Sequence, residues 1–358
     1  MGKDSGADAA GLPGGSKLSA LDYQVRAPVA MVVFNRPETT ARVLERIKAV
    51  RPRQVFVVAD APRSHVESDR ARCNAVREII DRIDWCQDVR KIYAQSNMGC
   101  RQRLASGISA VFDSVPEAII LEDDCLPDLS FFRYCDELLE RYRDREDVMS
   151  ISGANFQYGW PMSNSYYGSR FAHVWGWASW RRAWSRYDVS LSDWPELRRN
   201  PTLLDLETPG YREYWTRIFD LVRDGKIDTW DFQWTFAHMR HKAVAITPTV
   251  NLVENIGFSS GATHTARVPQ WFRQSAASIV TPLSHPCALK IDDDADKRTF
   301  RCCNRLRPPS VQMQLPKWVE SLHRRVPGWG FRHQVLLKLC RKAFSERAPT
   351  PGGGRGGS

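Results

Sequence analysis

Between residues 28 and 124, the sequence alternates four short apolar runs with three segments of helical periodicity. Apolar residues recur on one face in segments that begin at Thr39 or Thr40, cover about 67–84 and cover 101–113. The order β-α-β-α-β-α-β predicts an α/β fold with a mostly parallel, doubly wound sheet and right-handed crossovers. The four expected strands are Pro28–Phe34, Gln54–Asp60, Val89–Ala94 and Ala118–Leu121.

Polar side chains follow three of these expected strands at their carboxyl ends. Arg36 comes shortly after the first strand, Asp60 ends the second, and Glu122–Asp124 follow the fourth. In open α/β sheets, ligands bind beyond the carboxyl ends of the strands. We therefore expect these groups to form one shared site. Three adjacent carboxylates repel one another, and a divalent cation would relieve that repulsion.

The acidic cluster suits Mn2+ or Mg2+, because these hard cations bind through few carboxylates and keep positions for water and phosphate oxygens. Such an ion would stabilise a departing diphosphate by neutralising its charge. The sequence has no GxGxxG after the first strand and no GxxxxGK[ST]. A dinucleotide-dependent dehydrogenase or a P-loop NTPase is therefore disfavoured, and a metal and side chains would have to hold any phosphates.

Group transfer to a hydroxyl also requires a general base. Asp231 is the candidate, because Trp230 and Phe232 flank it and apolar surroundings raise the pKa of a carboxylate. The alternative is that Asp228, Thr229 or Asp231 only caps the helix that follows.

Other polar residues have weaker claims to a role in the site. Arg36, Arg101 and Arg103 could reach a phosphate or a nucleobase, although most arginines lie on a solvated surface. His264 could bind metal or phosphate, although a lone histidine is more often structural. Asp128 is expected to cap the helix that begins after it.

The remaining chain predicts further elements. A fifth strand is expected at about Val148–Gly153 and an irregular aromatic loop at 154–170. Gly176–Trp184 is expected to be a turn that enters a Trp-rich helix. Helices at about 210–224 and up to about 240 precede a strand at 243–250 and a loop at 251–258. The 13 Trp residues could line a carbohydrate or nucleotide pocket or fill the core.

Composition narrows the class of protein. The 358 residues include 51 Lys and Arg against 41 Asp and Glu, and this formal charge of +10 favours anionic ligands or surfaces. Nine Cys without paired metal-type spacing indicate reduced thiols in a cytoplasmic protein. No run approaches the ~18–20 apolar residues of a membrane span, and the N-terminus lacks the apolar core of a signal peptide.

Several stretches in a fixed order together resemble GT-A nucleotide-diphospho-sugar glycosyltransferases. They are similar to bacterial family-2-like transferases of the "hemolytic protein" type, which are related to the N-acetylglucosaminyltransferase I group. The Glu-Asp-Asp triplet alone is weak evidence for this resemblance, whereas the ordered set of stretches is strong evidence. The stretches are Val33–Pro37, Val58–Asp60, Leu121–Asp124 with Pro127–Phe132, Trp175–Trp180, Thr229–Asp231, and Asn255–Phe258 with Thr263–Thr265.

The resemblance implies a GT-A fold, which is Rossmann-like, and an inverting transfer of a sugar, from a UDP-sugar by default, to an acceptor hydroxyl. It implies that Arg36 and Asp60 hold the base region, that Asp123 takes the ribose and that Asp124 touches the metal. The diphosphate and waters would complete the metal shell, and Asp231 resembles the general base. The full set of candidates is Arg36, Asp60, Arg101, Glu122 and Asp123 for the donor, Asp124 and His264 for the metal, and Asp231 for catalysis.

The expected organisation is a disordered tail at 1–25, a catalytic domain at 26–265, a basic and partly helical extension at 266–348 and a second tail at 349–358. The acceptor would be a glycan or a lipid-linked molecule, as in polysaccharide biosynthesis. The basic extension could contact an anionic inner membrane peripherally, or it could only cap the catalytic domain.

Three other functions remain open at this point. The first is a non-catalytic binder of sugar nucleotides or glycans, and the second is a metal-dependent phosphohydrolase that uses the same carboxylates. The third, a nucleic-acid binder, has weak support, because aromatic and basic residues are interleaved only poorly in the basic C-terminus. We therefore expect no nucleic-acid partner. Nothing in the sequence indicates a pore-forming segment.

Overall fold

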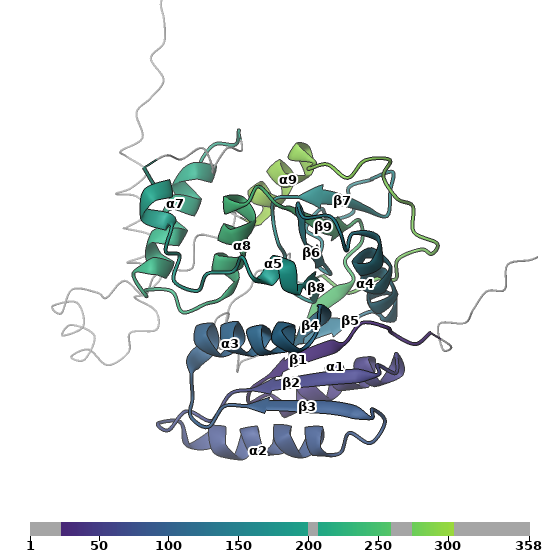
Figure 1. Ribbon diagram of the computed structural model, residues 1–358, viewed down its shortest axis with the longest axis vertical. Coiled ribbons are helices and arrows are strands. Elements are labelled where there is room, and N and C mark those ends of the chain that lie inside the picture. Colours follow the sequence, from purple (N-terminus) through teal and green to yellow (C-terminus); the bar gives the residue numbers. More distant parts are fainter. Residues whose placement is uncertain (1–22, 200–206, 259–273, 304–358) are drawn as a thin grey trace, which may run out of the picture. The chain divides into compact units, whose positions relative to one another are not determined.

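The computed structural model describes residues 23–199, 207–258 and 274–303, and these residues have the predicted mixed α/β architecture (Figure 1). Eight strands of this part of the chain form one sheet in the order β3-β2-β1-β4-β8-β6-β9-β7. The strands β7 and β8 run against the others, so the sheet is mostly parallel, as predicted. The strands of this sheet are β1 Val29–Val33, β2 Gln54–Ala59, β3 Asp88–Tyr93, β4 Glu117–Glu122, β6 Val148–Ser152, β7 Tyr166–Ser169, β8 Trp177–Trp180 and β9 Val244–Pro248.

The helices of the N-terminal half follow from the strand order. Right-handed crossovers place α1 and α2 on one face of the sheet and α3 on the other. The helix α3 approaches β2 closely, because a Cβ added at Gly107 would lie only 2.3 Å from Cγ1 of Val58. The described helices are α1 Pro37–Ala49, α2 Glu67–Asp81, α3 Gly99–Ser114, α4 Leu129–Arg141, α5 Arg181–Trp184, α6 Trp194–Leu197, α7 Tyr211–Arg223, α8 Asp231–Arg240 and α9 Asp293–Cys303.

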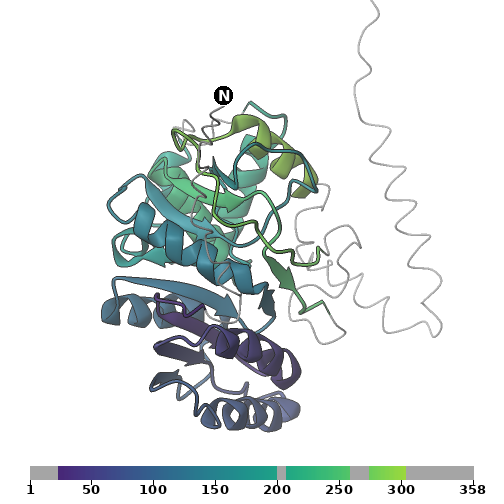
Figure 2. The same cartoon turned by 90° about the vertical axis from the view of Figure 1, so that its right-hand side faces the viewer.

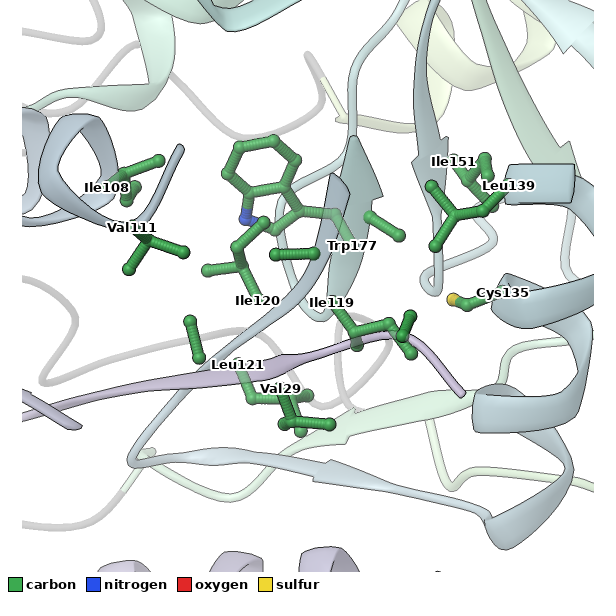
Figure 3. Close-up of a cluster of buried hydrophobic side chains, with 14 of the residues drawn as sticks. Val29, Ile108, Val111, Ile119, Ile120, Leu121, Cys135, Leu139, Ile151 and Trp177 are labelled. Atoms are coloured by element: carbon green, nitrogen blue, oxygen red, sulfur yellow. The ribbon is translucent and has the colours of Figure 1, made fainter. Parts of the chain in front are cut away.

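The centre of the core lies around β4. Its residues 118–121 are buried completely, which is expected of a strand with helices on both faces. Figures 1 and 2 both show β1–β3 with α1 and α2 at one end of the sheet and β7 with α9 at the other. Figure 3 shows the side chains of β4 between those of α3, α4 and β8; the labelled residues include Ile119, Ile120, Leu121, Ile108, Val111, Cys135, Leu139 and Trp177.

The aromatic residues of the middle segment fill the core. Trp177 and Trp234 are 1% and 0% exposed, and their ring centroids lie 5.6 Å apart. Trp184 lies 5.1 Å from Trp234, and Trp230 stacks on Trp177 at 5.6 Å. The Trp residues could have lined a ligand pocket or filled the core, and these four rings fill the core.

The structure corrects several expected elements. Trp177–Trp180 is the strand β8, because it pairs with β4 on one side and β6 on the other; only the following residues form a short helix. The expected loop at 154–170 contains the edge strand β7, and the expected loop at 251–258 contains β10, Val253–Asn255. The strand β10 pairs with β5, Cys125–Pro127. The helix α9 lies within the extension at 266–348, which was expected to be partly helical, but no helix was placed at 293–303.

The first residues of α1 and α4 can be compared with their predicted positions. The helix α1 begins at Pro37, earlier than expected, since proline fits the first turn of a helix, where its missing N–H is not needed. Asp128 caps α4 as predicted: its Oδ1 accepts a hydrogen bond of 2.9 Å from the backbone N–H of Ser130.

Some predictions concern residues outside the described ranges. These are the N-terminal tail through residue 22, His264, and the extension after residue 303. Within the described ranges, no helix combines the length and apolarity needed to cross a membrane.

Candidate functional site

The acidic cluster meets the end of β1, as the strand order requires. The strands β1 and β4 pair in parallel with Val32 opposite Glu122, so the residues after both strands lie side by side. The backbone N–H of Phe34 donates to Oδ2 of Asp123 at 3.1 Å. Nη1 of Arg36 donates to Oδ1 of Asp123 at 3.1 Å and to Oδ2 of Asp124 at 2.6 Å. These contacts join the two strand ends into one polar site.

The carboxylates of the site are crowded with negative charge. Burial, and then the charge of Asp124, raise the pKa of Asp123 to about 7, although Arg36 and the Phe34 N–H oppose this rise. Burial, followed by the charges of Asp124, Asp123 and Asp231, raises the pKa of Glu122 well above its ordinary value. Burial by itself would lower the pKa of Arg36, but Asp123 and Asp124 outweigh it and raise that pKa. The cluster therefore favours added positive charge.

A second segment closes on the acidic cluster through the β5–β10 ribbon. The backbone N–H of Ile256 donates to the backbone oxygen of Asp124 at 2.8 Å. The next residue is Gly257, and a Cβ built there would lie 2.2 Å from Oδ2 of Asp124. Only glycine permits this approach of the backbone. The sequence alone assigns Gly257 no role, although a glycine in Asn-Ile-Gly-Phe, shortly after an expected strand, is a sign of a close backbone approach.

Asp60 lies at the end of β2, but hydrogen bonds from its own chain engage both of its oxygens. Oδ1 accepts from the backbone N–H groups of Ala61 at 2.8 Å and Met98 at 3.0 Å. Oδ2 accepts from Nδ2 of Asn97 and from the N–H of Gly99, both at 3.1 Å. Asp60 thus ties the end of β2 to the start of α3, and this placement favours a positioning role.

Asp231 is the first residue of α8, and its Oδ1 accepts a hydrogen bond from the hydroxyl of Thr229. Its charge contributes to the raised pKa of Glu122. Burial, and then the charges of Glu122, Asp231 and Asp228, raise the pKa of the Cys100 thiol at the start of α3. Asp231 and Glu122 therefore lie within electrostatic range of the same thiol, which joins α8 to the neighbourhood of the acidic cluster.

The two arginines of α3 contact other parts of the protein. Nη1 of Arg101 lies 3.4 Å from the backbone oxygen of Val222, and its Nε lies 3.8 Å from Asp228. Arg103 is buried, and its Nη2 donates to the backbone oxygen of Ile92 at 2.6 Å. Arg101 thus faces the α7–α8 side of the site, whereas Arg103 anchors α3 to β3.

The donor set of the site is compatible with a hard divalent cation. Among residues 23–199, 207–258 and 274–303, no three His, Cys, Asp or Glu side chains form a ready metal cage. Asp123 and Asp124 nevertheless offer carboxylate oxygens, and the Arg36 guanidinium already brings positive charge to both. The missing side chain of Gly257 lets the backbone border Asp124 Oδ2 without a clash. The residues therefore fit a cation that takes most of its ligands from a bound phosphate and water.

Comparisons with known proteins give no family assignment. Neither a scan against protein-family models nor a search of curated proteins finds a match. Solved structures with partial similarity include the mannosyltransferase PcManGT from Pyrobaculum calidifontis in complex with GDP-Man and Mn2+, at 13% identity and TM-score 0.35 over 61% of this chain and 70% of that chain. The galactosyltransferase LgtC with donor and acceptor sugar analogs matches at 11% identity and TM-score 0.33 over 78% and 96%. A UDP-glucose pyrophosphorylase complexed with UDP-glucose matches at 9% and 0.29 over 62% and 90%. Identities of 9–13% and TM-scores of 0.29–0.35 do not assign a reaction to this chain.

Proposed function

We propose that this protein is a glycosyltransferase that moves a sugar from a nucleoside diphosphate donor to an acceptor hydroxyl, with inversion at the anomeric carbon. The observation that carries the proposal is the junction of Arg36, Asp123 and Asp124 at the ends of β1 and β4. The charge of Asp231 from α8 reaches the same cluster. A cation-binding carboxylate and a separate carboxylate base are the two groups that metal-assisted transfer to a hydroxyl requires.

In this proposal, Asp124 holds Mn2+ or Mg2+, and His264 is a second candidate ligand. When bound, the cation supplies positive charge that offsets the negative charge of the diphosphate leaving group. Asp123 takes the ribose hydroxyls, and Glu122 supports the cluster from the end of β4. Arg36 binds the nucleotide, while Asp60 holds the end of β2 against the start of α3.

Asp231 is the general base of the proposed chemical step. As the acceptor oxygen attacks the anomeric carbon, its proton passes to the Asp231 carboxylate and the bond between that carbon and the diphosphate oxygen breaks. Thr229 donates to Oδ1 of Asp231 and so orients the carboxylate. Arg101 lies on the α7–α8 side, where it could contact the donor or the incoming acceptor.

The substrate assignment is a UDP-linked hexose or N-acetylhexosamine as donor and a glycan or lipid-linked sugar as acceptor. Such a reaction belongs to polysaccharide biosynthesis in the cytoplasm. The basic residues after 303 would hold the protein peripherally at an anionic inner membrane.

The test begins with thermal shift of the full chain against UDP, GDP, CDP, ADP and their common sugar conjugates, each with and without Mn2+. A donor that stabilises only with Mn2+ is then used in a transfer assay with wild type and Asp231→Asn. We expect Asp231→Asn to keep donor affinity and to lose transfer by a factor of about 100 to 10,000. Full turnover by Asp231→Asn would remove Asp231 as the base.

The same experiment separates the alternatives. Donor binding with no transfer by the wild-type protein, across acceptors, would indicate a non-catalytic binder. Release of inorganic phosphate that is indifferent to Asp231→Asn would indicate a phosphohydrolase. The absence of a Mn2+-dependent shift with every nucleotide would refute the proposed donor site.

A further inference from the structure

We infer that Arg36 and a divalent cation compete for the same oxygen of Asp124, so that the nucleotide must draw the guanidinium away before the cation binds tightly. The inference rests on the proposed function, in which Asp124 holds the cation. It adds a role for Arg36 beyond donor binding, because Arg36 would make metal affinity depend on the nucleotide.

The first observation is the contact itself. Nη1 of Arg36 lies 2.6 Å from Oδ2 of Asp124 and 3.1 Å from Oδ1 of Asp123. The side chains of Arg36, Asp124 and Asp123 are only 22%, 14% and 7% exposed, so water screens this ion pair weakly. A charge-assisted hydrogen bond in such a setting is among the stronger ones in proteins. A cation at the same oxygen would meet the guanidinium as a like charge.

The second observation is that Asp124 has little freedom to avoid this conflict. A Cβ at Gly257 would lie 2.2 Å from Oδ2, so the backbone at Gly257 borders that oxygen. The N–H of Ile256 holds the backbone oxygen of Asp124 at 2.8 Å, and the Cys125 sulfur lies 3.7 Å from Oδ1. The carboxylate is thus enclosed by its own chain. A cation that reaches Oδ2 has to take the place of Arg36.

The third observation is that the backbone of Arg36 is held at the start of α1, so that leaving Asp124 would require movement of the side chain alone. Arg36 precedes α1, and its backbone oxygen accepts from the N–H of Thr40 at 2.9 Å, which belongs to the helix. Its long side chain reaches the carboxylates from this fixed point. A nucleoside diphosphate brings anionic oxygens that match a planar guanidinium. The nucleotide would therefore stabilise Arg36 in a position away from Asp124.

The consequence is a coupling between the two ligands. Mn2+ alone has to break the Arg36–Asp124 pair, whereas Mn2+ that arrives with a nucleotide does not. By linkage, the nucleotide raises the affinity for Mn2+ by the same factor by which Mn2+ raises the affinity for the nucleotide. Arg36 would contribute a defined part of this factor, in addition to any bridging of the cation by the diphosphate.

The experiment measures Mn2+ binding to the full chain by electron paramagnetic resonance of the free ion. Wild type is compared with Arg36→Met and with the control Arg63→Met. Arg63 is a suitable control, because it forms an ion pair of the same length, 2.6 Å, with Asp69, a carboxylate outside the acidic cluster. Without nucleotide, we expect Arg36→Met to bind Mn2+ roughly tenfold more tightly than wild type, and Arg63→Met to match wild type.

A second titration repeats the measurement with a saturating nucleoside diphosphate, chosen among UDP, GDP, CDP and ADP by thermal shift, after subtraction of Mn2+ bound by the nucleotide itself. Competition predicts that the coupling factor of Arg36→Met is several-fold smaller than that of wild type. Loss of one positive charge without competition would instead raise Mn2+ affinity equally with and without nucleotide. An unchanged coupling factor, or unchanged Mn2+ affinity in the first titration, would overturn the inference.

Asp124→Ala distinguishes failure of the inference from failure of the proposed function. If Asp124→Ala loses Mn2+ while Arg36→Met matches wild type, Asp124 holds the cation and only the competition is wrong. If Asp124→Ala binds Mn2+ as wild type does, the proposed metal site is wrong. Circular dichroism and melting temperature check that each variant folds, and Arg36→Gln replaces Arg36→Met if the latter does not.

Discussion

The close approach of Gly257 to Asp124 makes a single methyl group a sharp probe of the site. In Gly257→Ala, the added carbon would lie 2.2 Å from Oδ2, 2.8 Å from Cγ and 2.9 Å from Cβ of Asp124. No carbon atom is tolerated at 2.2 Å, so the carboxylate has to rotate away or the β10 end has to shift. Either movement disturbs the 2.6 Å pair between Arg36 and Asp124.

Two effects of Gly257→Ala can be given magnitudes. Overpacking in a well-packed region costs about 1–3 kcal/mol, so we expect the melting temperature to fall by several degrees at most. Displacing the Asp124 carboxylate removes a charged contact, for which ~1.5–3 kcal/mol is typical, and this corresponds to a loss of roughly 10-fold to 150-fold in nucleotide affinity with Mn2+. Isothermal titration calorimetry with Mn2+ present measures this loss.

A double-mutant cycle with Asp124→Ala tests the reasoning directly. Truncation of Asp124 removes two of the three atoms that the new methyl would meet, so most of the stability cost of Gly257→Ala should vanish in that background. Gly159→Ala is the control for the cycle: a Cβ there meets nothing within 4 Å, and the cost of alanine at its φ of 81° comes from the backbone, so that cost should be equal with and without Asp124→Ala. Equal stability costs in both backgrounds, or unchanged ligand affinity of Gly257→Ala, would show that the backbone does not border Asp124 as described.

Further predictions concern stability. Asp128→Ala should cost about 1 kcal/mol in urea unfolding, because it removes the cap of α4, and Asp128→Asn should restore most of it; equal values for both variants would refute the cap. Gly107→Ala should cost about 1–3 kcal/mol, since its Cβ would lie 2.3 Å from Val58, and Gly107→Ala/Val58→Ala should recover part of that cost. Burial lowers the pKa of His238 from 6.5 to about 4, so the folded state binds fewer protons than the unfolded state between these values. Stability should therefore fall as pH drops from 6.5 toward 4, with His238 contributing at most ~3 kcal/mol, and His238→Gln should lessen the fall in unfolding free energy measured across that range.

The N-terminal half of the fold was predictable because its signals are local. Each strand from β1 to β4 is an apolar run bounded by turn residues, and each connecting helix carries its own periodic face. A mostly parallel sheet gathers the carboxyl ends of its strands at one edge, and the observed pairing of β1 with β4 then places Arg36 beside Asp123 and Asp124.

The rest of the fold depends on partners that are remote in the sequence. Strand β8 has only four residues, and its identity is set by hydrogen bonds to β4 and β6. Strand β10 has three residues and exists because β5 lies beside it. Helix α9 is polar in its first turn, and Asp296 is buried there only because Ser169 and Arg170 of a distant segment bond to it. Local periodicity in the sequence predicts none of these pairings.

The candidate site also has parts that the local sequence predicts and parts that depend on remote segments. Carboxylates at strand ends were visible in the sequence, whereas the role of Gly257 depends on the β5–β10 ribbon. Asp60 was expected from its place at a strand end, but the N–H groups that occupy its oxygens come from the β3–α3 turn. A residue type and a position along a strand predict where a side chain lies, and only the assembled structure tells which bonds it has already made.

The reversed direction of β8 has a consequence for how this sheet can diversify. A strand that runs with its neighbours sends only its following residues to the edge where the acidic cluster lies. Because β8 runs the other way, with Trp177 opposite Ile120 of β4 and Ser152 of β6, the residues that precede it arrive at that edge instead. Residues 170–176 thus add an incoming segment to this edge, as do the residues before β7, among segments that leave the other strands. Insertions there could remodel the entrance for a second substrate while the strands that hold the first stay unchanged.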